Sequence, residues 1–539
     1  MAVAQQVEES PPVTEVDIFK ELDEVNKRYN EAQSKLRELA AIIQSRQQTL
    51  ERSLIEKADE VRWSRFRPEY LRQFIEEPYV IEPFRMQGSQ VLEWKVYVPK
   101  MVEFHVGRLE RATHSYNVFV VNQYMRWFAE IPQELSDRFP QVEIELKVED
   151  GMLVSPVEQT DRTFEKYRKY LYKKAGPGRL QIKKGSEWEL IAQILEDGGL
   201  PFTPQAVNQE DLRDNSKGGY ALTPKWGMRD YQKQAWETFM EYGAIGIYWP
   251  FGTGKSQFGI ELCDRLKGHK LIVAGGSKAL KEQWENRLCE MPEPRRRECH
   301  VVVYQSSNEI NKLAKEYKEF TLIIFDECHH LPAQTFMRLS TIPTKYRLGL
   351  TGSPYREDGH INYIMALTGY PHGLSWDKFV IEGIITLAQV QVHVVKKDRY
   401  KLSILDALLQ RDLGKTMIFC DSLDLGESIG KKYGIPWIYG ATKDRMDKIQ
   451  RNERVVISRV GDEGISIPEL DTVIEVDFLG GSRAQALQRV GRLQHRTLDV
   501  AKEPAVHHII MTEEEVEEYG KRILAYYDKG YKVDWLYDM

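Results

Sequence analysis

The chain has 539 residues, of which 42% are hydrophobic and 29% are charged, and its formal net charge is −6. This composition is ordinary for folded proteins and excludes collagen-like and wholly disordered classes. It also excludes a membrane-embedded class, since no apolar run reaches the roughly 18 residues that span a bilayer. The acidic balance argues against coating nucleic acid by bulk charge, although it leaves room for a local basic groove.

Cysteine usage and the first residues bear on the compartment. The five cysteines are an odd, sparse set without C-x-x-C spacing, which favours reduced thiols over a disulfide framework or a zinc site. The opening residues lack the basic and apolar regions of a secretion signal. We therefore expect a cytoplasmic, intracellular protein that is not secreted.

Residues 1–63 are expected to form a polar tail followed by one long helix. Apolar or small residues recur at alternating spacings of four and three from Ile18 to Ile43, which is a heptad pattern typical of a coiled coil. Residues 16–63 could pair with a second copy, with a partner protein or with the body of this chain, and the heptad pattern leaves these alternatives open.

Residues 64–217 mix strand and helix signals, so we expect an α+β accessory domain. Residues 94–98 alternate between apolar and polar or amphipathic types, which is the period of a half-buried strand. Residues 142–148 alternate in the same way, and Asp150-Gly151 then leads into a short apolar run. This arrangement predicts a β-hairpin with its turn at Asp150-Gly151.

A basic and aromatic cluster occupies residues 162–184, where Glu165 is the only acid. Cations that reach phosphates and aromatic rings that stack on bases are what a nucleic-acid surface needs. The alternative is a solvated amphipathic helix whose tyrosines face the core. Gly176-Pro177-Gly178 is expected to break the helix within the cluster. The candidate nucleic-acid contacts are Lys166, Arg168, Lys169, Lys173 and Lys174.

The rest of the chain has the pattern of an α/β protein. Residues 200–226 are rich in Pro, Asn, Asp and Gly and are interpreted as a linker. From there to residue 512, short apolar runs alternate with helical patterns, which predicts parallel sheets covered by helices on both faces. The strands suffice for two domains, at 218–395 and 396–512, followed by a C-terminal helix in 513–539.

A phosphate-binding loop is predicted at residues 250–256. The segment follows an apolar run and precedes a helical pattern, which is the context that such a loop requires, although Trp249 stands where the usual first glycine lies. Glycines let backbone N–H groups cradle phosphate oxygens, and the helix N-terminus adds its positive end. The expected ATP and Mg²⁺ ligands are Gly252, Thr253, Gly254, Lys255, which would reach the β and γ phosphates, and Ser256, which would ligate Mg²⁺.

Two further segments have the residues of phosphoryl transfer. An apolar strand pattern ends at Asp326-Glu327, where Asp326 can hold Mg²⁺ and Glu327 can deprotonate the attacking water. Acids capping a helix are the alternative there. The basic segment 488–496 supplies Arg492 as a candidate arginine finger, and Gln488 and Arg496 as further catalytic candidates. The alternative for this segment is an exposed basic helix.

These segments, taken in order, resemble the motifs of superfamily 2 helicases over about residues 228–496. The series begins with Arg229-Asp230-Tyr231-Gln232, the phosphate loop and Asp-Glu-Cys-His at 326–329. It continues with Leu-Thr-Gly-Ser-Pro at 350–354, Val-Gly-Asp-Glu-Gly-Ile at 460–465 and Gln-Arg-Val-Gly-Arg at 488–492. Three further segments look like the XPB-type branch and related phage DNA helicases of the UvsW type. They are residues 279–284, residues 304–306 and Arg356-Glu357-Asp358.

The resemblance implies two tandem RecA-like domains, ATP hydrolysis in the cleft between them and 3′-to-5′ movement on DNA. It implies that Gln232, with Arg229, reads the adenine and that Gly464 contributes to the nucleotide site. It also makes a set of residues candidates for nucleic-acid contact or for coupling ATP state to DNA grip, namely Gln283, Trp284, Thr351, Ser353 and Arg356. Three features depart from the family, since Ser466 replaces an Asp, Arg496 is one residue late, and there is little room for the thumb insertion of XPB.

The sequence therefore predicts an ATP-dependent DNA helicase or translocase that acts on duplex or branched DNA. Its N-terminal region would bind substrate or a partner. Two alternatives remain, a partner-gated ATPase motor recruited through the N-terminal helix and an RNA helicase, and the motif variants favour DNA over RNA.

Overall fold

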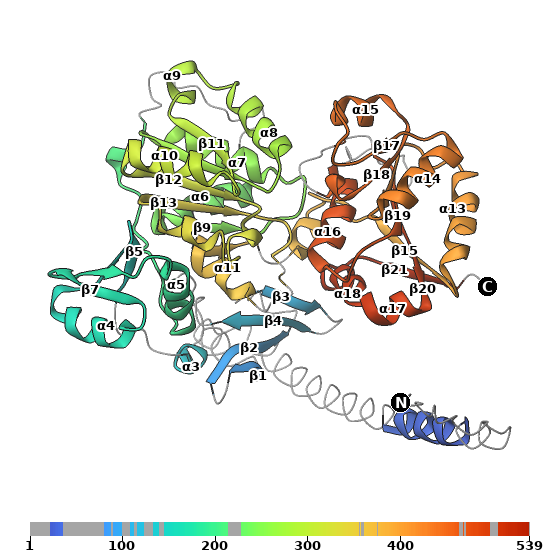
Figure 1. The fold of residues 1–539 in the computed structure, drawn as a ribbon, viewed down its shortest axis with the longest axis horizontal. Coiled ribbons are helices and arrows are strands. Elements are labelled where there is room, and N and C mark those ends of the chain that lie inside the picture. The colour runs from blue at the N-terminus through green and yellow to red at the C-terminus, as the bar shows by residue number, and fades with distance from the viewer. Residues whose placement is uncertain are drawn as a thin grey trace, which may run out of the picture. The chain divides into compact units, whose positions relative to one another are not determined.

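The computed structural model (Figure 1) describes residues 22–35, 80–87, 90–99, 108–112, 116–122, 133–139, 145–213, 228–354, 356, 360–373, 376–462, 467, 470–495 and 505–537. The chain forms two compact units, and both parallel sheets and the small antiparallel sheet lie within the larger unit. No helix among the described residues is long and apolar enough to cross a bilayer.

The described part of the N-terminal region is a helix over residues 22–35. Its heptad side chains Leu22, Val25 and Tyr29 are all more than half exposed. The remainder of the helix expected within 1–63 lies outside the described residues, so partner binding or self-association through 16–63 stays a prediction.

The accessory region begins with a four-stranded sheet. Its strand order is β1 (Val80–Gln87), β2 (Gln90–Pro99), β4 (Tyr116–Asn122), β3 (Arg108–Ala112), and the short helix α3 (Gln133–Ser136) follows in the chain. Trp94, Val96 and Val98 of β2 are buried, which confirms the strand predicted from their alternation.

A second, antiparallel sheet has the strand order β5 (Lys147–Glu149), β6 (Met152–Val154), β8 (Arg179–Ile182), β7 (Leu171–Gly176). Asp150 and Gly151 between β5 and β6 have φ angles of 47° and 70°. Positive φ at both central residues is the mark of a type I′ hairpin turn, so the predicted hairpin is confirmed. The helices α4 (Thr160–Tyr167) and α5 (Glu187–Glu196) complete this small domain.

The segment predicted as a linker is packed where it is described. Val207 is buried, and the Asp211 carboxylate accepts a hydrogen bond from Lys345 Nζ at 2.9 Å. Residues 201–213 therefore lie against the first α/β domain, and residues 214–227 lie outside the described residues.

The first α/β domain has a parallel sheet in the order β11 (Cys299–Val303), β10 (Lys270–Ala274), β12 (Phe320–Asp326), β13 (Thr344–Leu350), β9 (Ala244–Ile247), β14 (Tyr370–His372). The residues of β9 and β10 are all buried, as expected of strands with helices on both faces. The main helices are α6 (Asp230–Tyr242), α7 (Lys255–Arg265), α8 (Lys278–Leu288), α10 (Ser307–Tyr317) and α11 (Ile361–Thr368), with short α9 (Glu293–Arg296) and α12 (Asp377–Ile381).

The second domain has a parallel sheet in the order β17 (Trp437–Ile438), β18 (Arg454–Ile457), β16 (Thr416–Cys420), β19 (Thr472–Asp477), β20 (Val506–Thr512), β15 (Gln389–Val395), β21 (Val533–Tyr537). Its helices are α13 (Lys401–Leu409), α14 (Leu423–Tyr433), α15 (Arg445–Arg451), α16 (Arg483–Gly491), α17 (Glu513–Tyr519) and α18 (Lys521–Asp528). Two tandem α/β domains with parallel sheets were predicted, and both are present.

The boundaries of the second domain differ from those expected at residues 396 and 512. Strand β15 already pairs with β20, so the second sheet begins before residue 396. The C-terminal segment is not a lone helix, because α17 and α18 lead into β21, which pairs with β15. The pairing of distant strands, which local patterns do not encode, determines both boundaries.

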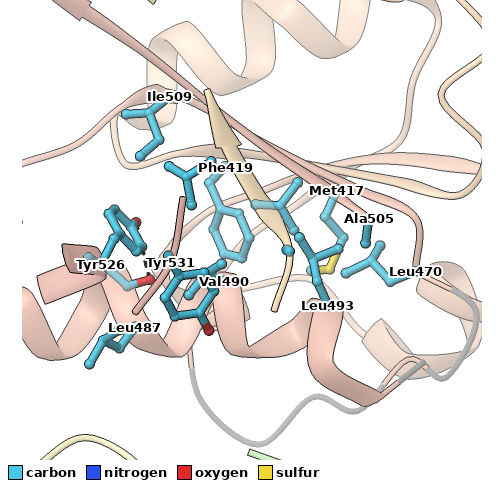
Figure 2. Close-up of a cluster of buried hydrophobic side chains, with 14 of the residues drawn as sticks. Met417, Phe419, Leu470, Leu487, Val490, Leu493, Ala505, Ile509, Tyr526 and Tyr531 are labelled. Carbon is cyan, nitrogen blue, oxygen red and sulfur yellow. Dashed lines mark hydrogen bonds between the residues drawn. The ribbon is translucent and has the colours of Figure 1, made fainter. Parts of the chain in front are cut away.

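The core of the second domain joins helix α16 and the C-terminal segment to the sheet (Figure 2). Leu487 and Val490 of α16 and Tyr526 and Tyr531 of the C-terminal segment are buried in the same cluster as Phe419 of β16. The C-terminal segment is thus part of the domain core rather than an appendage.

Candidate nucleotide site and nucleic-acid surface

The loop at 248–254 connects the buried strand β9 to helix α7 and has the backbone of a phosphate-binding loop. Gly252 and Gly254 have φ angles of 74° and 88°, a region that side chains other than glycine rarely adopt. The Thr253 hydroxyl donates to the Pro250 carbonyl at 2.7 Å and ties the loop together. Helix α7 begins at Lys255, so its N-terminal N–H groups and the glycine turns suit a bound phosphate.

Trp249, which replaces the usual glycine, is a core residue beneath the loop. It is fully buried, its Nε1 donates to His372 Nδ1 at 3.1 Å, and its ring meets the Tyr231 ring edge-on at 4.8 Å. The Tyr231 hydroxyl in turn donates to the Thr253 carbonyl at 2.7 Å. The Trp249 ring therefore lies in the core, where it packs against the Tyr231 ring that is hydrogen-bonded to the loop.

Lys255 is held against the loop that precedes it. Its ammonium donates to the carbonyls of Trp249 at 3.1 Å and Pro250 at 2.9 Å. Burial lowers the pKa of Lys255 to about 8, against the opposing effect of the Glu327 and Asp326 carboxylates. Ser256 follows in the first turn of α7. Both residues lie where the sequence predicted them, at the start of the helix.

Asp326 lies at the carboxyl end of β12, and both its oxygens accept hydrogen bonds. The Glu327 backbone N–H donates to Oδ1 at 3.1 Å, and the Trp284 indole Nε1 donates to Oδ2 at 2.7 Å. Burial, followed by the charge of Glu327, raises the pKa of Asp326. Trp284 is itself buried, so its side chain is not exposed to a nucleic acid in this structure, and its predicted coupling role stays a prediction.

Glu327 is held in an unusual backbone conformation, with φ at 48°. A non-glycine residue in this region costs about 1–3 kcal/mol and is often found at functional sites. The Thr351 hydroxyl donates to Glu327 Oε2 at 3.2 Å, and His329 Nδ1 lies 3.4 Å from the same oxygen. Burial acts to raise the pKa of Glu327, but the hydrogen bond and charge of His329, together with the charges of Lys255 and His330, outweigh it and hold the pKa below its usual range.

Three further candidates lie near the acid pair in the first domain, but only Thr351 hydrogen-bonds to it directly. The other two are Ser353 and Arg356. The Ser353 N–H donates to Thr351 Oγ1 at 3.1 Å, and both side chains are buried. Arg356 Nη1 donates to the His329 carbonyl at 2.6 Å. The first two side chains are thus buried, whereas Arg356 also lines a cavity, and the coupling roles of all three stay predictions.

Gln232 and Arg229 lie at the start of helix α6, beside the phosphate loop. Gln232 Oε1 accepts from the Arg229 N–H at 3.0 Å. A Cβ built on Gly254 would lie 3.0 Å from Gln232 Nε2, so the amide contacts the loop directly. Gln283, another candidate, is partly exposed on helix α8.

A cavity of about 610 Å³ is lined by residues of both α/β domains. Gln488 lines it from α16, and Arg356 lines it from the first domain. Arg492, the candidate finger, donates from Nη2 to the Asp462 carbonyl within the second domain. Gly464 and Arg496 lie outside the described residues, so their roles stay predictions.

Two residues of the Gln-Arg-Val-Gly-Arg region were missed by the sequence reasoning. Arg489 is fully buried and binds the carboxylates of Asp421 at 2.6 Å, Asp462 at 2.7 Å and Glu475 at 2.7 Å. Gln494 Oε1 accepts from the Phe251 N–H of the phosphate loop at 3.1 Å. The partners are scattered along the chain, so no local pattern could have revealed either contact.

The basic cluster at 162–184 is a helix followed by a hairpin. Helix α4 ends at Tyr167, and β7 and β8 then pair across the turn at Pro177-Gly178, so the expected helix through the cluster is wrong. β7 is an edge strand with mostly exposed side chains, which removes the alternation that would have marked it.

The cations of this cluster fall into two groups. Lys166, Arg168 and Lys174 form ion pairs with Asp197, Glu165 and Asp161. Among the residues that the structure describes, Lys169 and Lys173 have no acidic partner and lie instead near the rings of Tyr170 and Tyr172. Tyr167 is buried, as the alternative interpretation expects, whereas Tyr172 is 68% exposed, and nucleic-acid contact by this cluster stays a prediction.

Comparison with known proteins identifies two family segments. Residues 225–356 match the model for the res subunit of type III restriction enzymes, and residues 396–532 match the model for the ERCC3/RAD25/XPB C-terminal helicase. A putative DNA 3′-5′ helicase Rad25 of Haloarcula marismortui is 30% identical over 56% of this chain and 55% of its own length. The DNA 3′-5′ helicase XPB of Mycobacterium tuberculosis is 28% identical over 50% of this chain and 58% of its own length.

This chain therefore spans just over half the length of these curated relatives. Among solved structures, S. cerevisiae Dbp5 bound to RNA and ADP BeF3 aligns with a TM-score of 0.46 at 14% identity, over 60% of this chain and 92% of that chain. The two family segments follow one another in the order of the motifs, each on its own parallel sheet. Residues 225–356 and 396–532 are thus similar to these two families, in line with the resemblance of the motifs to superfamily 2 helicases.

Proposed function

We propose that this protein is an ATP-driven DNA helicase or translocase that moves 3′ to 5′ and requires Mg²⁺. The observation that carries the proposal is the phosphate loop itself, in which Gly252 and Gly254 have positive φ and Lys255 begins helix α7. Gln494 of the second domain accepts a hydrogen bond from the same loop. ATP use is common to the helicase family, and the relatives named DNA 3′-5′ helicases support DNA as the track.

The residues of the site suit the parts of a phosphoryl-transfer reaction. ATP with Mg²⁺ supplies the phosphoryl group and neutralises its charge when bound. The loop N–H groups and Lys255 bind the phosphates, Ser256 and Asp326 would hold Mg²⁺, and ionised Glu327 accepts a proton from the attacking water. Arg492 and Gln488 would meet the γ-phosphate from the second domain, which makes hydrolysis depend on the arrangement of the two domains.

The first test measures ATP hydrolysis by the full chain with single-stranded DNA, duplex DNA, a four-way junction or RNA. We expect at least one DNA form to raise the steady-state rate several-fold, and RNA to raise it less. Lys255→Ala is the blank, since it removes the cation that binds the phosphates. A rate of ATP hydrolysis that no nucleic acid raises would contradict the proposal and favour a partner-gated motor. Stimulation by RNA alone would favour an RNA helicase.

We also propose that the hairpin β7–β8 with helix α4 contacts the DNA backbone. Lys169 and Lys173 are exposed and lack an acidic partner among the described residues, so they can meet phosphates without breaking an ion pair. Lys166, Arg168 and Lys174 would have to exchange an intramolecular carboxylate for a phosphate. Lys169 and Lys173 are therefore the residues expected to dominate this contact.

The double variant Lys169→Ala with Lys173→Ala should weaken DNA binding and flatten its salt dependence. Each lysine that neutralises a phosphate adds about 0.9 to the slope of log K against log salt, so we expect the slope to fall by about 2. Fluorescence anisotropy with labelled duplex over a salt series measures it. The matched control is Lys312→Ala with Lys315→Ala on the exposed face of α10, and an equal loss in both variants would refute the hairpin contact.

A further inference from the structure

The indole of Trp284 links helix α8 to the acid that ends strand β12. Its Nε1 donates to Asp326 Oδ2 at 2.7 Å, and this hydrogen bond is buried. Trp284 is 2% exposed and Asp326 is 8% exposed, so solvent does not compete for the bond. A hydrogen bond to a carboxylate in such surroundings is strong and fixes the orientation of both groups.

The ring of Trp284 has little freedom to move away from Asp326. A Cβ built on Gly259 of helix α7 would lie 2.8 Å from Trp284 Cη2 and 3.4 Å from Ile324 Cδ1. The far edge of the indole is therefore packed against the backbone of the phosphate-loop helix, beside strand β12. Gly259 leaves the space that the ring occupies, and any larger residue there would push on it.

The two hydrogen bonds of Asp326 together set the plane of its carboxylate. Glu327 N–H binds Oδ1 and the Trp284 indole binds Oδ2, which leaves the remaining lone pair of each oxygen with a fixed direction. Groups that hydrogen-bond to a metal ligand orient it, and their loss commonly weakens metal binding 10–100-fold. The Trp284 indole is such a group, because it hydrogen-bonds to Asp326, the acid that would hold Mg²⁺.

We propose that Trp284 is a positioning residue that orients Asp326 toward the Mg²⁺ of the bound nucleotide. The inference rests on the proposed ATPase function and adds a residue that would act through Asp326. It also gives helix α8 a direct contact with the acid. The N-cap Ser277 and Ala279 in the first turn of this helix line the cavity between the α/β domains. A displacement of α8 would thus move the Trp284 indole and change the orientation of Asp326.

The test compares the affinity of the full-length protein for a fluorescent ADP analogue in excess Mg²⁺ and in EDTA. In the wild type, Mg²⁺ should tighten binding, and the ratio of the two affinities measures the contribution of the metal. Trp284→Phe keeps an aromatic ring and removes the N–H donor. We expect the ratio to fall 10–100-fold while the affinity in EDTA stays near that of the wild type.

Two further variants keep the test decisive. Trp236→Phe makes the same change on α6, where the ring packs on the Arg265 guanidinium, and should leave the ratio unchanged. Gly259→Ala raises helix propensity and should fold, yet its Cβ crowds the indole, so the ratio should fall in the same direction as in Trp284→Phe.

A wild-type ratio in both Trp284→Phe and Gly259→Ala would overturn the inference. An equal loss of affinity in Mg²⁺ and in EDTA would also overturn it, because that result indicates a general packing role. These outcomes are distinct from failure of the proposed function, which appears as a wild-type protein whose ATP hydrolysis ignores nucleic acid.

Discussion

Replacing Glu327 with glutamine should lower the DNA-stimulated rate of ATP hydrolysis by about 10²–10⁴-fold, the usual contribution of a positioned general base. The amide keeps the size of the side chain and can still accept from the Thr351 hydroxyl, which now donates to Glu327 Oε2 at 3.2 Å. It cannot accept a proton from water. The effect should therefore fall on kcat, while the KM for ATP changes little.

Steady-state kinetics at saturating DNA, with nucleotide binding measured in parallel, separates these two effects for Glu327→Gln. The matched control is Glu319→Gln, which makes the same change at an exposed position just before the same strand. It should leave kcat unchanged. A normal DNA-stimulated rate in Glu327→Gln would remove Glu327 as the base and require another acceptor for the proton.

Replacing Glu475 with glutamine should destabilise the second α/β domain by about 3–5 kcal/mol, the usual result of breaking a buried ion pair on one side. Glu475 on β19 is fully buried and binds the guanidinium groups of both Arg489 and Arg522, while His507 Nε2 lies 2.9 Å from its other oxygen. Asp421 and Asp462 also neutralise Arg489, so the unpaired charge left behind is chiefly that of Arg522.

Urea unfolding followed by circular dichroism, with the second-domain transition fitted separately, measures the change in the free energy of unfolding. Glu427→Gln on helix α14 is the control, because its ion pair with Lys431 is exposed and contributes about 0–1 kcal/mol. If Glu475→Gln and Glu427→Gln cost the same, the buried network does not stabilise the domain in the way we infer.

The same network predicts how the stability difference varies with pH. Although burial opposes it, the charges of Arg522 and Arg489 lower the pKa of Glu475 below its ordinary value of 4.5. A carboxyl group with a lowered pKa in the folded state stabilises the protein above its unfolded pKa and loses this effect as pH falls. The advantage of the wild type over Glu475→Gln should therefore be full at neutral pH and shrink below about pH 4.5.

How much of this could be predicted from the sequence depends on whether a feature is local. Strands such as β10, β12 and β16 were evident because each is a short apolar run, and the phosphate loop was evident because glycines, Lys255 and a following helix are adjacent in the chain. Asp150-Gly151 was evident for the same reason, since the turn requires two consecutive residues that tolerate positive φ.

The features that were missed depend on side chains brought together from distant segments. Trp284 looked like a possible nucleic-acid contact because nothing near it in the sequence reveals the Asp326 carboxylate that its indole binds. Arg489 looked like one cation among several, although three acids from separate strands and loops surround it. The edge strand β7 was read as helix because its exposed face needs no apolar alternation.

The position of β15 in the second sheet has a consequence for how this domain is made. β15 is the first strand of the sheet to be synthesised, yet its neighbours are β20 and β21, which follow only after residue 505. During synthesis, both edges of β15 therefore stay unpaired until the rest of the sheet has been made. Strands with unpaired edges are prone to pair with the wrong strand. Strand β9 of the first domain is in the same position, since its neighbours β13 and β14 follow only after residue 343, so both nascent domains expose an unpaired first strand during synthesis.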